Sequence, residues 1–222
     1  MKPTLRGRPG VFLTLEGGEG AGKSTLARGL AERARADGVD VVVTREPGGT
    51  AGAEAVRHVV LSGAAKRFGA FGEALLFAAA RADHVRAVIR PALARGALVI
   101  CDRFSDSTRA YQGIAGGLDH DILHALERVA IGSTGPDLTL ILDIDPHDAV
   151  ARRHQRAGTG DRFEDEGSAF HVKLREAFRQ IARDNPQRCR LLDAAQSKDK
   201  LGAEAWGLVE GVLAARTMAV HA

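Results

Sequence analysis

The stretch "LEGGEGAGKST" (residues 15–25) decides the fold, because it contains the phosphate-loop pattern G-x-x-x-x-G-K-[ST]. The apolar run "VFLTLE" (11–16) predicts a strand entering the loop, and a helix over 22–37 leaves it with Leu26 and Leu30 facing inward. Glycines in this setting let backbone N–H groups converge on phosphate oxygens, and the helix N-terminus adds a favourable dipole. The residues expected to hold phosphate are Gly17, Gly18, Glu19, Gly20, Ala21, Gly22, Lys23, Ser24 and Thr25.

The chain has 222 residues, which is long enough for one domain with a full hydrophobic core. Its net charge of +3 comes without a lysine-rich tract, so nucleic-acid binding is not supported. A membrane helix is not expected, because no run of about 18 apolar residues occurs. Cys101 and Cys189 are too few for a disulfide framework or a zinc site, and they fit buried thiols in a reducing cytoplasm.

Short apolar runs alternate with helical patterns along most of the chain. Strands are expected at 11–16, 39–46, 97–103, 137–144 and 189–194. Helices are expected at 22–37, 70–95 (kinked or ended by Pro91), 119–131, from Pro146 onward, and at 201–216. Five near-continuous apolar strands separated by helices predict a three-layer α/β fold, with a five-stranded parallel sheet flanked by helices. We expect one domain over 11–214, with a disordered tail at 1–10 and a C-terminal tail at 215–222.

The helix expected at 119–131 carries Ile122, Leu123, Leu126 and Val129 on one face. Apolar residues at this spacing are the pattern of a helix that packs against a core.

Charged residues follow the predicted strands at the edge where parallel sheets bind ligands. Asp102 ends the strand at 97–103 and is expected to hold Mg²⁺ together with the hydroxyl of Ser24. Arg45 and Arg103 also follow strands, so they are expected to bind the phosphate of an acceptor near the loop. The alternative for the two arginines is an ordinary surface ion pair.

Other classes of phosphate-loop protein are tested by their own motifs. A Ras-type GTPase needs N-K-x-D, but the only asparagine, Asn185, is followed by proline. The transporter signature L-S-G-G-Q is also missing from the sequence. A small chain with a single phosphate motif favours a kinase for a small acceptor. A non-catalytic nucleotide sensor is the rival from a different class.

Four further motifs resemble those of thymidylate kinases in order and spacing. They are "TREPGGT" (44–50), "EALLFAAARADH" (73–84), "DRFSDSTRAYQG" (102–113) and "PDLTLILDI" (136–144). The resemblance implies a P-loop nucleoside monophosphate kinase fold and transfer of the γ-phosphate of ATP to dTMP with Mg²⁺. It also implies a homodimer. Another nucleoside monophosphate kinase, acting on dUMP or a purine, is the nearest alternative.

The resemblance also implies how the acceptor site is built. Phe77 and Arg81 share one helix face, where the ring would stack on a pyrimidine. The guanidinium of Arg81 only donates, so it suits thymine O4 and not the amino group of cytosine. Glu19 is implied to accept from the 3′-hydroxyl of dTMP; a solvent-facing loop acid is the alternative. The residues expected to bind dTMP are Glu19, Arg45, Phe77, Arg81, Arg103, Ser107, Tyr111 and Gln112.

The phosphate loop contains no arginine, so further positive charge is expected from the segment 151–164, which resembles the lid of this family. Closure of a lid excludes water from the reaction. Which of the lid arginines acts is left open, and for Arg152 and Arg153 a charged helix face is an equal alternative. The expected catalytic set is Lys23, Arg45, Arg103, Arg153, Arg156 and Arg162.

Overall fold

The computed structural model describes residues 10–154, 163 and 166–218. Five strands form one parallel sheet in the order β2-β3-β1-β4-β5. The strands are β1 (Val11–Glu16), β2 (Val41–Arg45), β3 (Leu98–Asp102), β4 (Leu138–Asp143) and β5 (Cys189–Asp193). All five strands that the sequence predicts are therefore present, each within two residues of its expected ends. The central position of β1 places the phosphate loop in the middle of the sheet's carboxyl edge.

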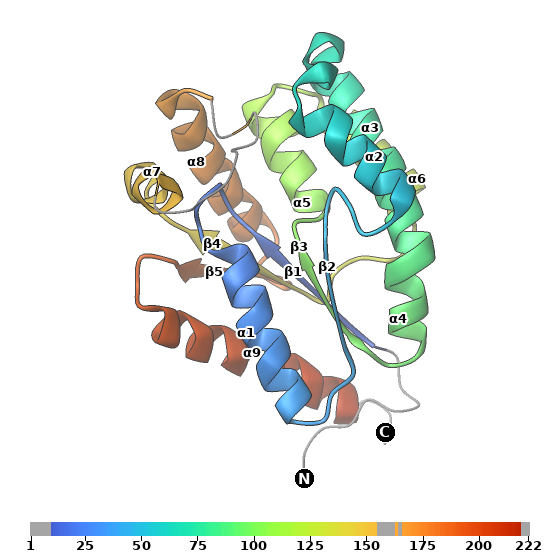
Figure 1. The fold of residues 1–222 in the computed structure, drawn as a ribbon, viewed down its shortest axis with the longest axis vertical. Helices are drawn as coiled ribbons and strands as arrows, with labels where there is room; N and C mark the ends of the chain where they lie inside the picture. The colour runs from blue at the N-terminus through green and yellow to red at the C-terminus, as the bar shows by residue number, and fades with distance from the viewer. Residues whose placement is uncertain (1–9, 155–162, 164–165, 219–222) are drawn as a thin grey trace.

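Helices cover both faces of this sheet (Figure 1). They are α1 (Lys23–Ala36), α2 (Ala51–Leu61), α3 (Gly69–His84), α4 (Arg90–Ala94), α5 (Ser105–Thr108), α6 (His120–Ile131), α7 (Pro146–His154), α8 (Ser168–Asp184) and α9 (Lys198–Met218). A 3-10 turn precedes α3 at Ala64–Phe68, and π-helical segments follow α3 at Val85–Ile89 and α5 at Arg109–Ala115. Pro91 lies in the first turn of α4, where its missing N–H is tolerated. The helix predicted over 70–95 therefore passes from π-helical to α-helical geometry near Pro91 and does not end there.

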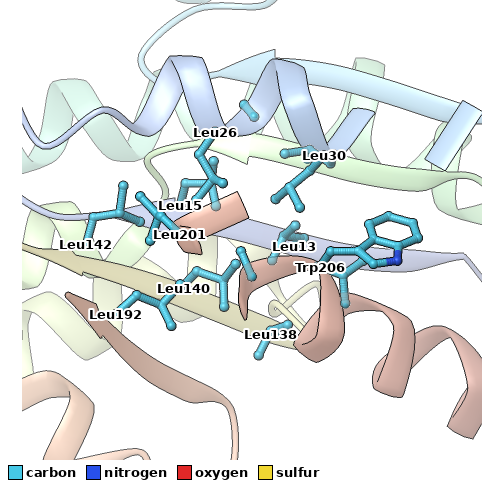
Figure 2. Close-up of a cluster of buried hydrophobic side chains, with 14 of the residues drawn as sticks. Leu13, Leu15, Leu26, Leu30, Leu138, Leu140, Leu142, Leu192, Leu201 and Trp206 are labelled. Atoms are coloured by element: carbon cyan, nitrogen blue, oxygen red, sulfur yellow. The ribbon is translucent and has the colours of Figure 1, made fainter. Parts of the chain in front are cut away.

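Two hydrophobic layers hold the helices on the sheet. On one face α1 and α9 pack against Leu13 and Leu15 of β1, and Figure 2 shows Leu30 and Trp206 reaching this layer from the two helices. On the other face Phe12 packs with residues of β3 and of the α3–α4 segment. Because successive side chains of β1 point to opposite faces, an apolar run without alternation is needed to fill both layers.

Some expectations from the sequence are wrong in detail. In α6 Leu123 is buried, but Ile122 is 39% exposed and Val129 is 87% exposed, so only part of the predicted apolar face meets the core. The helix α9 continues to Met218, beyond the domain end expected at 214. Gly10 is buried, and its N–H donates to the carbonyl of Leu93 over 2.8 Å, although it was expected in the tail.

Both cysteines are free and buried, as the sequence predicts. Within the part of the chain that the structure describes, no helix combines the length and apolar character needed to cross a membrane.

Candidate active site

The phosphate loop connects β1 to α1 at the carboxyl edge of the sheet. The buried Nζ of Lys23 donates to the carbonyl oxygens of Gly17 at 2.9 Å and Gly18 at 2.8 Å, which closes the loop. Gly20 has a φ of 80°, and a Cβ there would lie 2.5 Å from the carbonyl oxygen of Ala149 in α7. The loop therefore rests directly on the backbone of α7, and only glycine fits at this position.

The ammonium group of Lys23 has an unusual environment. Burial is the main cause that lowers the pKa of Lys23 to about 8, and the positive charge of Arg103 acts in the same direction. The carboxylates of Asp102, Glu19 and Glu16 oppose this shift. A nearby anion favours the charged form of a lysine, so phosphate in the loop would keep this ammonium protonated.

The two residues predicted to hold Mg²⁺ lie in contact. The register of the sheet places Asp102 beside Leu15, at the end of β3 next to the loop. The hydroxyl of Ser24 donates to Oδ2 of Asp102 over 2.5 Å. One hydroxyl and one carboxylate provide the hard oxygen ligands that Mg²⁺ prefers. The described residues contain no group of three or more acidic, histidine or cysteine side chains that could hold a metal ion by themselves.

Arg103 connects the loop to the segment that follows β3. Its φ of 70° is a left-handed conformation that only this residue adopts among the described non-glycine residues, and such strain concentrates at functional sites. Its guanidinium donates to the Gly17 carbonyl at 3.0 Å, to Ser107 Oγ at 3.2 Å and to Glu19 Oε1 at 3.0 Å. The three contacts hold the cation at the mouth of the loop, where the sequence predicts a phosphate-binding arginine.

Glu19 is buried inside this group of cations, and it is not the solvent-facing acid of the alternative interpretation. Its Oε1 accepts from Arg103 and from the hydroxyl of Tyr111. Burial alone would raise the pKa of Glu19, but the charges of Arg103 and Lys23 and the Tyr111 hydrogen bond outweigh it and lower the pKa. The carboxylate is therefore ionised at neutral pH.

The second oxygen of Glu19 is left without a partner. Among the described residues no hydrogen bond reaches Glu19 Oε2, and Nδ1 of the buried His171 in α8 lies 3.9 Å away. An unsatisfied buried carboxylate oxygen costs free energy, so a hydrogen-bond donor that reached this atom would be bound favourably.

A pocket that is partly open to solvent adjoins the phosphate loop. Seven of the eight residues that the sequence predicts for the acceptor line it: Glu19, Phe77, Arg81, Arg103, Ser107, Tyr111 and Gln112. They come from the loop, α3, and the segment after β3, so the fold brings together side chains that are far apart in the chain.

Arg45 is the predicted residue that does not line this pocket. Its side chain is 55% exposed and forms a 2.9 Å ion pair with Glu54 of α2. Arg57, also in α2, lines the pocket instead and donates from Nη1 to the Pro47 carbonyl at 3.0 Å. Sequence reasoning missed Arg57 because it did not predict α2 at all. The N-capping threonine of that helix, Thr50, accepts from Ala53 N and was the available signal.

Glu16, the last residue of β1, is a second functional residue that sequence reasoning missed. Its carboxylate accepts from Phe104 N at 2.8 Å and from Ser107 Oγ at 2.6 Å, which orients the segment that carries Arg103. Burial is the main cause that raises the pKa of Glu16 to about 7, and the neighbouring Asp106 adds to it. In the sequence this acid appears only as the polar end of an apolar strand.

The predicted lid arginines fall largely outside the described residues. Arg156 and Arg162 are not described, and for Arg153 the structure gives only the backbone, in the last turns of α7. Their roles therefore stay predictions. The start of α7 is as expected, because Asp145 accepts from the N–H of His147 over 3.0 Å at the helix N-terminus.

Comparisons with known proteins point to one family. The family model described as thymidylate kinase matches residues 15–205. A thymidylate kinase from Bradyrhizobium sp. (strain ORS 278) is 55% identical over 202 residues, covering 90% of this chain and 89% of the relative. One from Nitrobacter winogradskyi is 53% identical over 206 residues, covering 92% and 90%.

A solved structure agrees with these sequence relatives. The crystal structure of thymidylate kinase from Ehrlichia chaffeensis superposes with a TM-score of 0.72 at 35% identity, covering 91% of this chain and 99% of that one. The matched family model spans the phosphate loop, the residues that line the acceptor pocket and the strands β2 to β5. The chain belongs to the thymidylate kinase family.

Proposed function

We propose that the protein transfers the γ-phosphate of ATP to dTMP. The observation that carries the proposal is the pocket beside the phosphate loop, which has an aromatic ring at Phe77 and the donor-only guanidinium of Arg81 at one end. At its other end Arg103 and Glu19 border the loop. A pyrimidine nucleotide whose base carries a carbonyl at position 4 matches this distribution of charge.

The pocket supports a specific orientation of dTMP. The thymine ring would stack on Phe77 and accept a hydrogen bond from Arg81, while the 5′-phosphate would lie against Arg103 near the loop. The unpartnered Oε2 of Glu19 supports the role of this residue as acceptor for the 3′-hydroxyl. Ser107, Tyr111 and Gln112 would close the wall of the pocket around the sugar; Tyr111 is held there by its hydrogen bond to Glu19.

The donor side rests on the phosphate loop. Its backbone N–H groups and Lys23 would bind the β- and γ-phosphates of ATP. Ser24 and Asp102 would hold Mg²⁺, which when bound supplies charge neutralisation on the phosphate oxygens. The attacking oxygen of a nucleoside monophosphate is already anionic, so the residues here act by positioning and electrostatic stabilisation and no general base is needed.

Two parts of the catalytic set remain inferences. We place one lid arginine, among Arg152, Arg153, Arg156 and Arg162, on the transferred phosphoryl group, because the phosphate loop itself has none. Arg45 stands at the carboxyl end of β2, one residue before the segment that forms the pocket wall at Glu46 and Pro47. To act there, the guanidinium of Arg45 would have to leave its ion pair with Glu54 and bind the phosphate of the acceptor.

Initial rates with dTMP, dUMP, dCMP and dGMP as acceptors, each with ATP and Mg²⁺, test the proposal. We expect dTMP to give the highest kcat/KM and dCMP to be poor, since its 4-amino group cannot accept from Arg81. A preference for dCMP or dGMP would contradict the assignment of Phe77 and Arg81. Absence of ADP formation with every acceptor would instead favour a nucleotide-binding protein without kinase activity.

We also infer a homodimer in the cytoplasm. The exposed apolar side chains Phe71 and Leu75 of α3 and Ile122 and Val129 of α6 support a second copy as the partner, because these two helices pack against each other. The free thiols support the location, since a reducing compartment keeps cysteines unpaired.

A further inference from the structure

A chain of buried hydrogen bonds runs behind the base-reading end of the pocket. Thr44 Oγ1 in β2 lies 2.7 Å from His84 Nε2, and His84 Nδ1 lies 3.0 Å from Glu46 Oε1. The other oxygen, Glu46 Oε2, accepts from Arg81 Nε at 2.7 Å. His84, Glu46 and Arg81 are all at least 95% buried. This series of hydrogen bonds therefore links the edge strand β2 to the guanidinium of Arg81, which lines the pocket.

The contacts of Arg81 account for three of its five N–H donors. Nε donates to Glu46, and Nη2 donates to the Phe104 carbonyl and to Thr108 Oγ1, each at 3.1 Å. The guanidinium also lies over the Phe104 ring, 5.2 Å from its centre. Within the described residues no acceptor is found for Nη1, and Arg81 lines the pocket. The fixed orientation thus presents the two N–H groups of Nη1 to a ligand.

Glu46 lines the same pocket as Arg81, so its carboxylate is a potential acceptor at the base-reading end. Both of its oxygens are occupied in the structure, one by Arg81 and one by His84. A carboxylate with a free oxygen here would accept from the amino group of cytosine, which is the contact acidic side chains make with that base. His84 thus engages the oxygen of Glu46 that Arg81 does not bind.

The turn at Gly49 confines the position of the His84 ring on the side of Thr44. A Cβ at Gly49 would come within 2.7 Å of the ring and 2.8 Å of Thr44 Oγ1, so the turn after β2 packs closely on this side. With its ring confined, His84 can donate from Nδ1 to Glu46 while Nε2 accepts the Thr44 hydroxyl hydrogen. This arrangement satisfies both ring nitrogens without a ligand.

We propose that His84 is a positioning residue for base specificity, which keeps Glu46 turned away from the base and thereby excludes cytosine nucleotides. This inference rests on the proposed function, because it assumes that Arg81 reads the base of the acceptor. His84 touches no substrate in this arrangement and acts through Glu46. Its effect should therefore appear in discrimination between bases and in KM, and not in the transfer step.

Kinetics of His84→Leu with dTMP and dCMP test the inference. Leucine has a similar size but no donor, so Glu46 Oε1 loses its partner. We expect the ratio of kcat/KM for dTMP to that for dCMP to fall by roughly tenfold or more. The KM for dTMP should rise while kcat for dTMP changes by less than about threefold, because Lys23 and Arg103 are untouched. If His84→Leu does not fold, His84→Ala is measured with the same expectation.

Two control variants separate this role from a purely structural one. Thr44→Val removes the hydrogen bond between Thr44 and His84 and leaves the contact between His84 and Glu46. His84→Asn keeps an amide donor that can reach Glu46. Both should lower Tm, yet keep the discrimination of the wild type. If discrimination falls in all variants in proportion to Tm, or in none, the inference is wrong. A wild-type protein that does not prefer dTMP would instead refute the proposed function.

Discussion

Two acidic residues three positions apart, Glu16 and Glu19, have pKa values shifted in opposite directions. Both are buried, and burial favours the neutral form of each. Glu19 has the guanidinium of Arg103 at 3.0 Å and Lys23 nearby, so its pKa falls. For Glu16 burial is the main cause that raises the pKa to about 7, and the charge of Asp106 adds to it. The surrounding charges therefore decide whether the effect of burial on the pKa is outweighed, as at Glu19, or increased, as at Glu16.

The raised pKa of Glu16 predicts that its neutral isostere is stabilising. The folded state binds a proton that the unfolded state releases between pH 4.5 and about 7, so the free energy of unfolding should fall as pH rises through this window. In Glu16→Gln the amide can donate to Ser107 Oγ and this loss disappears. At pH 8 we expect the variant to be about 1–3 kcal/mol more stable in urea unfolding. The gain should vanish at pH 4; an equal gain at both values would contradict the assigned pKa.

Glu19→Gln is expected to weaken binding of dTMP more than binding of ATP. The change removes the charge that Oε2 offers to the 3′-hydroxyl, and it leaves the cations of the phosphate loop less neutralised. Steady-state kinetics should give a KM for dTMP raised by roughly tenfold, with the KM for ATP changed by less than about threefold. Asp40→Asn, an exposed acid paired with Arg95 away from the site, serves as the control. A larger rise in the KM for ATP would refute the assignment.

At the scale of elements, strands were predictable and several helices were not. Buried parallel strands read as continuous apolar runs, and β1, β3 and β4 are of this kind. The helix α8 was not predicted, although its buried residues recur at helical spacing. In α6 only part of the predicted apolar face is buried. Val129 is apolar and lies seven residues, or two helical turns, after Ile122, and nothing in this spacing distinguishes a core face from an exposed apolar surface.

The contacts of the site were less predictable than its residues. The acceptor residues could be named from motif and resemblance, and seven of eight line one pocket. The ion pair of Arg45 with Glu54 and the raised pKa of Glu16 depend on partners brought in by folding. Asp106, for example, is 90 residues further along the chain than Glu16. Such energies arise from tertiary proximity, which local sequence does not encode.

The segment that begins in α7 carries the prediction about the lid. Alanine is substituted in turn for Arg152, Arg153, Arg156 and Arg162, and kcat is measured at saturating dTMP and ATP. We expect one substitution to lower kcat by about 10³-fold, which is the size of arginine effects in related phosphoryl transfer. Arg183→Ala, an exposed arginine of α8 paired with Glu176, controls for loss of surface charge. Unchanged kcat in all four variants would remove the lid from the mechanism.

At the scale of the whole molecule, the surface formed by α3 and α6 predicts the oligomeric state. Val129 is 87% exposed, so glutamate at this position costs little in folding but places a charge in an apolar interface. Sedimentation should show a dimer for the wild type and a monomer for Val129→Glu. Val172→Glu, at a 58% exposed apolar position on α8, should remain dimeric. A wild-type monomer at micromolar concentration would contradict the inferred dimer.

The close approach of Gly20 to Ala149 has a consequence for how sequences of this fold can vary. The position binds nothing through a side chain, yet a methyl group there would collide with the backbone of α7. In a library of all single substitutions, we therefore expect Gly20 to be as intolerant as Lys23. Neighbouring Gly18 has open space around its Cβ position and should accept alanine. The replacements permitted in the loop would then depend on its packing against α7 as much as on phosphate binding.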